Sequence, residues 1–197
     1  ASSDELDNPQ TPSQISCFDQ YRNGVPGACS LANSSAVLSW PSARRQWLRA
    51  GGALYGLTVA AGKTGADFGL RAAMTLSTRL ISIQRVKAGE RVGYAGLYQC
   101  PEDMPVGVAA IGYGDGYPRN IKPGTPALLN GQRVTVIGRV SMDLMTLDLR
   151  SQPDAQVGDP VVLWGEGLPI EEIADAANTI SYELTCSITR RVRFIEA

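Results

Sequence analysis

Histidine is absent from this chain of 197 residues. Without it, the chain cannot by itself contain a Ser-His-Asp triad or a metal site built on imidazole ligands, and we expect no metal. The sequence also contains no apolar run that approaches the roughly 20 residues of a membrane-spanning helix. No signal peptide is recognisable. We therefore expect neither secretion nor a membrane partner.

The chain also lacks an excess of charge of either sign. It has 18 basic and 19 acidic residues, which gives a formal net charge of -1. No long-range field would steer such a protein to nucleic acid. Cysteine is scarce, and no pair has CxxC spacing, which favours buried free thiols in a reducing compartment, the cytoplasm, over disulfides or a zinc site. The four cysteines are Cys17, Cys29, Cys100 and Cys186.

An initiator methionine is missing as well. The first residues, "ASSDELDNPQTPSQ", are typical of a loop that follows a strand and leads into a helix. The sequence therefore predicts a fragment, or one piece of a longer chain. With 44% hydrophobic residues, it can still form one or two domains with a sizeable core.

The first part of the chain has an α/β pattern. Residues 11–23 predict a helix with Ile15 and Phe18 on one face and Thr11 or Ser13 as its cap. Next we expect a strand at 28–35, a helix at 42–50 and a strand at 51–56. A strand-helix-strand unit this short indicates parallel pairing in an α/β sheet or barrel.

From about residue 70 the pattern is that of β structure. Asn130-Gly131 favours a type I′ hairpin turn. Residues 169–180 predict the one clear helix, and residues 183–196 alternate like a closing strand. The fold class is therefore α/β followed by all-β, the second part being a compact barrel or sandwich. The helix should bury Ile170, Ile173, Ala174 and Ala177.

Small polar residues and glycines mark a possible phosphate site in the first part. Ser34 lies at the C-terminal end of the strand at 28–35, at the edge where α/β barrels hold ligands. Arg49 precedes Gly51 and Gly52, whose backbone a ligand can approach closely. Together these residues could form a phosphate cup. The alternatives are a helix cap at Ser34 and a tight packing corner at the glycines.

Two tyrosine-bearing stretches in the second part suggest a ligand without specifying one. Tyr94 lies between glycines and could project toward a substrate, although most such tyrosines are ordinary sheet aromatics. "GYGDGYPR" is neither a dinucleotide fingerprint nor an EF-hand loop. By itself it reads as a rigid turn that exposes Arg119 and is bent by its glycines. Asp143 in "GRVSMDLM" could orient a cation or simply end a strand.

Taken in order, several stretches resemble the second half of alanine racemase. They are "SLANSS", "RAGGALYG", "VGYAG", "GYGDGYPR", "GRVSMD", "GDPVVLWGEG" and "ISYEL". The resemblance implies a cytoplasmic isomerase that uses pyridoxal 5′-phosphate (PLP) and supplies D-alanine for peptidoglycan. It also implies a homodimer with shared active sites. Residues 1–60 would be the last βα units of a (β/α)8 barrel, and residues 61–197 would be the C-terminal β domain.

The resemblance assigns cofactor roles to five residues. Ser34, Gly51, Gly52 and Tyr182 would hold the PLP phosphate. Arg49 would face the pyridine nitrogen, and because a guanidinium stays protonated, that nitrogen would remain largely unprotonated. The ring would then be a weaker electron sink, which disfavours transamination.

The resemblance assigns the remaining site residues to proton transfer and to the substrate. Tyr94 would be one of two bases acting on a PLP aldimine, and it would work in the partner's site. The Met142 amide would bind the substrate carboxylate, and Asp143 would position an arginine from outside this chain. The residues expected to line the entrance are Tyr113, Arg119, Arg139 and Tyr182, with Tyr113 and Tyr182 as a narrow gate.

The PLP-bearing lysine of the family falls outside this sequence. None of Lys63, Lys87 and Lys122 matches its motif, so we expect this chain alone to be inactive. Ala50 and Gly52 depart from the family pattern and suggest a wider pocket. The alternatives are therefore a PLP racemase of broader specificity, a related decarboxylase, or a catalytically inactive β-domain interaction module.

Overall fold

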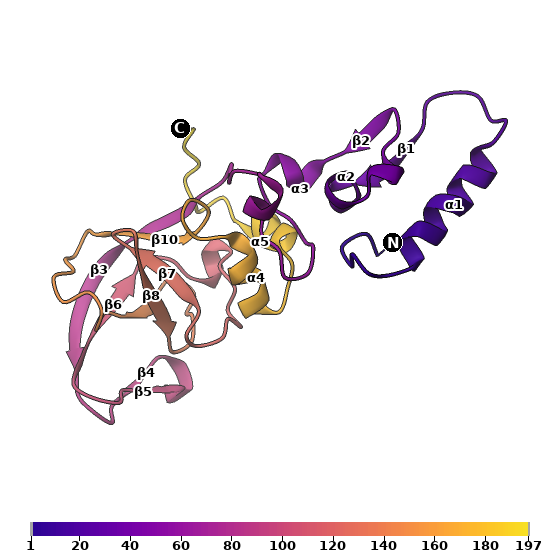
Figure 1. Ribbon diagram of the computed structural model, residues 1–197. Coiled ribbons are helices and arrows are strands. Elements are labelled where there is room, and N and C mark those ends of the chain that lie inside the picture. The colour runs from indigo at the N-terminus through magenta and orange to yellow at the C-terminus, as the bar shows by residue number, and fades with distance from the viewer. Residues whose placement is uncertain (1, 197) are drawn as a thin grey trace. The chain divides into compact units, whose positions relative to one another are not determined.

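The computed structural model describes residues 2–196. The chain forms two compact units, Ala1–Ala73 and Met74–Ala197. The first is a short α/β unit and the second is built on a β-barrel, which confirms the predicted order of fold classes (Figure 1). Among the described residues, no helix has both the length and the apolar character that crossing a membrane requires.

The α/β unit begins with the predicted helix. Helix α1, Gln10–Arg22, buries Ile15, whereas Phe18 is only half-buried. The predicted cap is wrong, because the helix starts after Pro9 and Thr11 lies buried in its first turn. The other elements of this unit are β1 (Ser30–Asn33), α2 (Ser34–Ser39), η1 (Pro41–Ala43), β2 (Trp47–Arg49), α3 (Gly51–Leu54) and η2 (Gly65–Phe68).

The predictions for residues 42–56 have the wrong element order. The segment predicted as a helix contains β2, and the segment predicted as a strand contains α3. Strand β2 pairs in parallel with β1, so the predicted parallel pairing is confirmed with a different second strand. Tertiary pairing decides here because each segment is too short for its own periodicity to specify a structure.

The second unit contains a closed barrel of six antiparallel strands. Its strand order is β10-β3-β6-β9-β8-β7, and β10 pairs with both β3 and β7. The barrel therefore has no free edge. Its strands are β3 (Leu76–Val86), β6 (Met104–Ala109), β7 (Pro126–Leu129), β8 (Gln132–Ile137), β9 (Met145–Asp148) and β10 (Pro160–Trp164).

Four shorter elements and two helices complete this unit. A small sheet of β4 (Arg91–Val92) and β5 (Tyr98–Gln99) flanks η3 (Tyr94–Gly96), and η4 (Tyr113–Asp115) follows β6. Helix α4 (Ile170–Ala177) buries the four predicted apolar residues. In the hairpin, Asn130 and Gly131 both have positive φ, as a type I′ turn requires.

The predicted closing strand at 183–196 is wrong. Helix α5, Ser181–Ser187, occupies its first part, and the chain continues without regular structure. Ser181 and Leu184 are buried one helical turn apart, which explains why this segment is a helix. The residues after α5 bond to the loop that contains Asp115 rather than to a neighbouring strand: the Thr189 amide donates to the Asp115 carbonyl at 3.0 Å.

The four cysteines are free. Cys100 is buried and Cys29 is half-buried, whereas Cys17 and Cys186 are exposed. The expectation of free thiols is thus met, and the expectation that they are buried is wrong for two of them.

Candidate functional site

In the α/β unit, the structure brings Ser34, Gly51 and Gly52 together. Ser34 is buried at the start of α2, and its hydroxyl accepts a hydrogen bond from the Ala53 amide at 3.3 Å. That contact joins Ser34 to α3, which begins at Gly51. Gly52 is buried, while a Cβ added at Gly51 would meet nothing within 4 Å. The corner therefore leaves room for a group next to the Gly51 backbone.

Arg49 belongs to the same end of the small parallel sheet. It lies at the last position of β2, in register with Asn33 of β1. Its guanidinium donates to the Ser30 hydroxyl at 2.8 Å and to the Leu31 carbonyl at 3.3 Å. Because carboxyl ends of parallel strands meet at one edge, Arg49 and Ser34 emerge at the same edge. A hydroxyl, two glycine backbones and a cation are suited to an anionic ligand.

In the barrel unit, Tyr94 protrudes from the short element η3. The residue is 66% exposed. Gly93 packs so closely on the loop after β8 that an added Cβ would lie 2.9 Å from the backbone nitrogen of Arg139. Ala95 has a φ of 60°, a left-handed conformation that is unusual for alanine. Tyr94 is thus held between two constrained backbone positions.

A pocket of about 380 Å³ lies beside Tyr94. Tyr94 and Arg139, predicted separately from the sequence, both line it. Its other lining residues are Gly93, Val108, Ser141, Leu144, Met145 and Thr146. The pocket combines a phenol and a guanidinium with apolar walls, a composition typical of small-molecule sites.

The loop that contains the "GYGDG" motif packs backbone to backbone against its neighbours. A Cβ added at Gly112 would lie 2.2 Å from the Ser141 carbonyl oxygen, and one at Gly116 would lie 2.3 Å from the Ser187 carbonyl oxygen. Of the three glycines, only Gly116 has a positive φ, at 104°. Gly112 and Gly114 are therefore needed for close packing rather than for the bending that we expected from the sequence.

Two backbone hydrogen bonds join this loop to the loop of Met142. The Tyr113 amide donates to the Ser141 carbonyl at 3.0 Å, and the Gly114 amide donates to the Met142 carbonyl at 2.8 Å. Arg119 lies over the Tyr113 ring, 5.8 Å from its centroid. The structure thus places Tyr113, Arg119 and Met142 in one neighbourhood. Their roles at an entrance and at the substrate carboxylate stay predictions.

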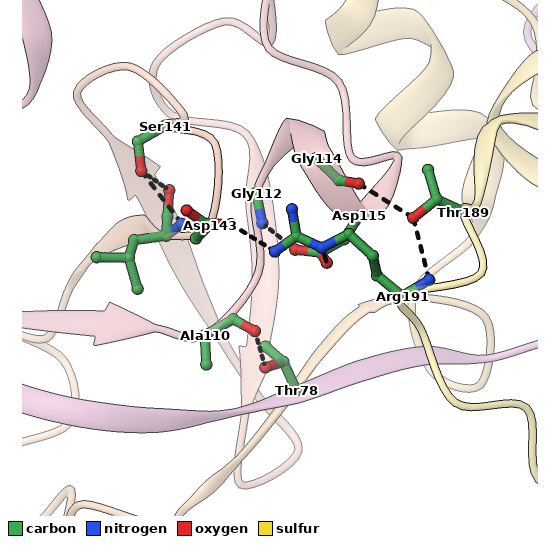
Figure 2. Close-up of polar contacts among 10 residues, drawn as sticks. Thr78, Ala110, Gly112, Gly114, Asp115, Ser141, Asp143, Thr189 and Arg191 are labelled. Atoms are coloured by element: carbon green, nitrogen blue, oxygen red, sulfur yellow. Dashed lines mark hydrogen bonds and ion pairs between the residues drawn. The ribbon is translucent and has the colours of Figure 1, made fainter.

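An arginine that sequence analysis missed connects the same two loops. Figure 2 shows Arg191 between Asp115 and Asp143: its Nε lies 3.2 Å from Asp115 Oδ1, and its Nη2 donates to Asp143 Oδ1. The hydrogen bond to Asp143 raises the pKa of Arg191 above its ordinary value. Asp143 thus contacts a cation of this chain, and its predicted role toward an arginine from outside the chain stays a prediction. The only sequence signal was a basic pair, Arg190-Arg191, inside a segment predicted as a strand.

Tyr182 lies in the first turn of α5 and is half-buried. Its carbonyl accepts a hydrogen bond from the Thr185 hydroxyl at 2.9 Å. At the other end of this helix, the Ser187 hydroxyl donates to the Gly116 carbonyl at 3.0 Å. The "GYGDG" loop therefore contacts both the Met142 loop and the helix that carries Tyr182.

The second tyrosine of "GYGDGYPR" has no place in the site. Tyr117 is 1% exposed and stacks on Trp164, with ring centroids 5.8 Å apart. Burial raises the pKa of its hydroxyl well above the ordinary value. Tyr117 is a core residue, and Tyr113 is the tyrosine that faces solvent. In residues 2–196, no group of three or more potential metal ligands comes together.

Comparison with known families identifies the family of both parts of the chain. The family described as "Alanine racemase, C-terminal domain" matches residues 73–196, and "Alanine racemase, N-terminal domain" matches residues 1–59. The chain belongs to the alanine racemase family. The resemblance seen in the sequence is thereby confirmed across both parts of the chain.

Similar alanine racemases come from several bacteria. That of Nitrosococcus oceani is 52% identical over 193 residues, which cover 98% of this chain and 54% of the relative. That of Shewanella sediminis is 48% identical over 192 residues, again covering 98% of this chain and 54% of the relative. The chain therefore spans about half the length of the curated relatives it matches.

Solved alanine racemases have the same fold over this span. The biosynthetic enzyme from Pseudomonas aeruginosa superposes with a TM-score of 0.94 at 44% identity, covering 98% of this chain and 54% of that one. An alanine racemase from Bartonella henselae, with covalently bound pyridoxal phosphate, gives 0.84 at 26% identity, covering 99% of this chain and 54% of that one. The end of the racemase N-domain and the β-barrel of this chain thus follow the family.

Proposed function

We propose that this chain is the C-terminal portion of an alanine racemase that interconverts L- and D-alanine with PLP. The observation that carries the proposal is the joint placement of Ser34, Arg49, Gly51 and Gly52 at one sheet edge, in a chain 52% identical to a curated racemase. The four free cysteines fit a reducing, cytoplasmic location.

The residues of the α/β unit fit the cofactor. The Ser34 hydroxyl and the backbone at Gly51 and Gly52 would hold the phosphate, where the space beside Gly51 admits a group that a side chain would block. Tyr182 would add its hydroxyl. The cofactor supplies the electron sink that acidifies the substrate's Cα proton.

Arg49 would set the protonation of the cofactor ring. A guanidinium is protonated at all physiological pH values and has no acceptor atom. Opposite a pyridine nitrogen it can only donate a hydrogen bond, so the nitrogen keeps its lone pair. The hydrogen bonds from Arg49 to Ser30 and Leu31 already hold its side chain against β1, which supports a fixed orientation.

Tyr94 would move a proton on one face of the substrate. Racemisation needs a proton to leave Cα on one face and another to arrive on the opposite face, so two bases are required. Tyr94 would be one base, and a lysine in the part of the family that this chain does not cover would be the other. The exposed phenol and the adjacent pocket support this role.

We further propose that the enzyme is a homodimer in which Tyr94 acts in the partner's site. Tyr94 and Leu144 line the pocket and are exposed at 66% and 39%. Leu97 and Met142, close to them in the sequence, are each 51% exposed, and large exposed apolar side chains of this kind are typical of an interface. Burial of these side chains against a second subunit would remove them from water. Met142, Asp143, Tyr113, Arg119 and Arg139 would then line the path of the substrate.

The proposal can be tested by joining residues 1–197 to the preceding part of the Nitrosococcus oceani racemase. The fusion protein should racemise alanine in the presence of PLP, and the 197-residue chain alone should not. In D2O, Tyr94→Phe should slow Cα proton exchange from one enantiomer by about 100-fold or more, and from the other far less. Exchange is followed by NMR from each pure enantiomer.

Tyr98→Phe is the matched control for Tyr94. Tyr98 lies four residues away in β5 and is half-buried, with its hydroxyl 3.8 Å from the Met104 sulfur. We expect its loss to leave both exchange rates within about threefold of the unsubstituted fusion. Equal slowing from both enantiomers in Tyr94→Phe would contradict the two-base assignment.

Product analysis separates the alternatives. A racemase of broader specificity would also convert serine, lysine or arginine. A decarboxylase would release CO2 from one of these substrates. A fusion that folds and dimerises but neither binds PLP nor converts any amino acid would indicate an interaction module instead.

A further inference from the structure

Arg191 joins two loops that are far apart in the sequence. Asp115 belongs to the loop of Tyr113, and Asp143 follows Met142 in the next loop, 48 residues before Arg191. The guanidinium contacts both carboxylates at once, through Nε and Nη2. Figure 2 shows this bridge together with Thr189, whose hydroxyl donates to the Gly114 carbonyl at 3.0 Å.

The "GYGDG" loop is shaped to admit this arginine. A Cβ at Gly114 would lie 2.3 Å from Arg191 Nη1, so any side chain there would displace the guanidinium. Asp115 is held from its other side, because its Oδ2 accepts a hydrogen bond from the Gly112 amide at 2.9 Å. The Asp115 side chain is only 13% exposed. The bridge is therefore anchored on the side of the Tyr113 loop.

The bridged loops determine where the Met142 amide points. In a trans peptide, the carbonyl and the following N–H point in opposite directions. The Tyr113 amide holds the Ser141 carbonyl at 3.0 Å, so the N–H of Met142 must point away from the Tyr113 loop. Any shift of the Tyr113 loop against the Met142 loop would turn this N–H.

Stability alone does not account for the bridge. Arg191 and Asp143 keep 50% and 58% of their side chains exposed, and an ion pair this exposed adds little to folding stability, so the contact with Asp143 is not explained by stability. An arginine can, however, satisfy two carboxylates in a fixed geometry, which a lysine cannot. We therefore expect the bridge to fix the position of the two loops relative to each other.

We propose that Arg191 is a positioning residue for substrate binding: it locks the Tyr113 and Met142 loops so that the Met142 amide faces the substrate carboxylate. The inference rests on the proposed racemase function. It assigns Arg191 no contact with substrate or cofactor. Its effect should therefore appear in KM for alanine before it appears in kcat.

The test uses the fusion protein loaded with PLP and compares Arg191→Gln with Arg191→Lys. We expect Arg191→Gln to raise KM for alanine about 10- to 100-fold while kcat changes less than about threefold. Arg191→Lys should restore part of the loss, since an ammonium can still pair with one carboxylate. Amide exchange at Gly114, measured by NMR, should quicken in Arg191→Gln because its bond to Met142 loosens.

Arg150→Gln is the matched control. Arg150 also bridges two carboxylates, with Nη2 2.7 Å from Asp148 and Nη1 2.7 Å from Glu102. It should change neither KM nor exchange at Gly114. An unchanged KM in Arg191→Gln, or an equal rise in Arg150→Gln, would overturn the inference.

The two proposals fail in different ways. If the unsubstituted fusion folds and binds PLP but does not racemise alanine, the proposed function fails, and exchange at Gly114 then decides the role of Arg191. Unchanged exchange in Arg191→Gln would show that Arg191 does not lock the loops. Faster amide exchange at Gly114 in Arg191→Gln would support the conclusion that Arg191 holds the Tyr113 and Met142 loops together.

Discussion

The main sheets of the two units differ in whether their strands have free edges. In Met74–Ala197, six strands close into a barrel, and each of these six has two hydrogen-bonded neighbours. In Ala1–Ala73, β1 and β2 form a parallel sheet of two strands, each with one free edge within the described residues. Parallel sheets are normally covered on both faces and contain more strands.

The side chains differ in the same way. Leu147, Leu163 and Trp164 of the barrel are completely buried. In the α/β unit, Trp47 is 67% exposed and Leu54 is 77% exposed. The barrel therefore encloses a core of its own, while the two-stranded sheet of the α/β unit leaves large apolar side chains of β2 and α3 exposed to water.

The largest effect should come from separating the units. Expressed alone, Met74–Ala197 should unfold cooperatively with a free energy of about 5 kcal/mol or more, whereas Ala1–Ala73 should not form a stable fold. The barrel unit contains a single tryptophan, Trp164. Its fluorescence in a urea titration reports unfolding of the barrel directly.

Circular dichroism and the urea dependence of hydrogen exchange would check the α/β unit in parallel. A cooperative transition in the Ala1–Ala73 fragment, or none in Met74–Ala197, would break the comparison.

A smaller effect should come from matched glycine substitutions in the two units. Gly112→Ala places a Cβ 2.2 Å from the Ser141 carbonyl oxygen and 2.4 Å from that of Met142. Because both obstacles are backbone atoms, the barrel unit should lose about 1–3 kcal/mol of unfolding free energy. Gly51→Ala meets nothing within 4 Å and should change stability by less than about 0.5 kcal/mol.

Thermal unfolding of the fusion protein measures both variants, and PLP titration adds a second reading. If the cofactor phosphate binds beside Gly51, Gly51→Ala should weaken PLP binding without loss of stability. A destabilised Gly51→Ala variant would mean that this corner is packed rather than open.

The smallest effect concerns two buried hydroxyls. The Tyr117 hydroxyl is buried with no hydrogen-bond partner, so Tyr117→Phe should leave stability unchanged or raise it by about 1 kcal/mol. In the α/β unit, the Ser34 hydroxyl has a partner, the Ala53 amide. Ser34→Ala should therefore cost about 1 kcal/mol. Urea titration of the fusion protein compares them.

Tyr117 also predicts a pH dependence. Burial raises its pKa in the folded protein above the unfolded value of about 10. Above that pH the unfolded chain releases a proton that the folded protein retains, so stability falls as pH rises. In Tyr117→Phe, the free energy of unfolding should therefore fall less between pH 9 and about pH 11 than it does in the unsubstituted protein. An equally steep fall in the variant would exclude Tyr117 as its source.

Long periodic segments and strong turn signals were predictable from the sequence. Helix α4 and the Asn130-Gly131 hairpin are the clearest cases, because their patterns extend over several residues or require a rare conformation. The segments at 42–56 and 183–196 were mispredicted because short elements adopt the structure that their neighbours stabilise. Strand β2 exists because β1 pairs with it.

The candidate site, too, was predictable only in part from the sequence. The sequence by itself was enough to recognise the family, because several short motifs occur in the family's order. The same motifs singled out the tyrosines, arginines and glycines of the candidate site. Only the tertiary structure decided what those glycines do. Gly112 admits the Ser141 and Met142 carbonyls, and Gly114 admits Arg191. A contact that spans 48 residues, such as that of Arg191 with Asp143, leaves no periodic trace, because it depends on how a closed barrel brings its loops together.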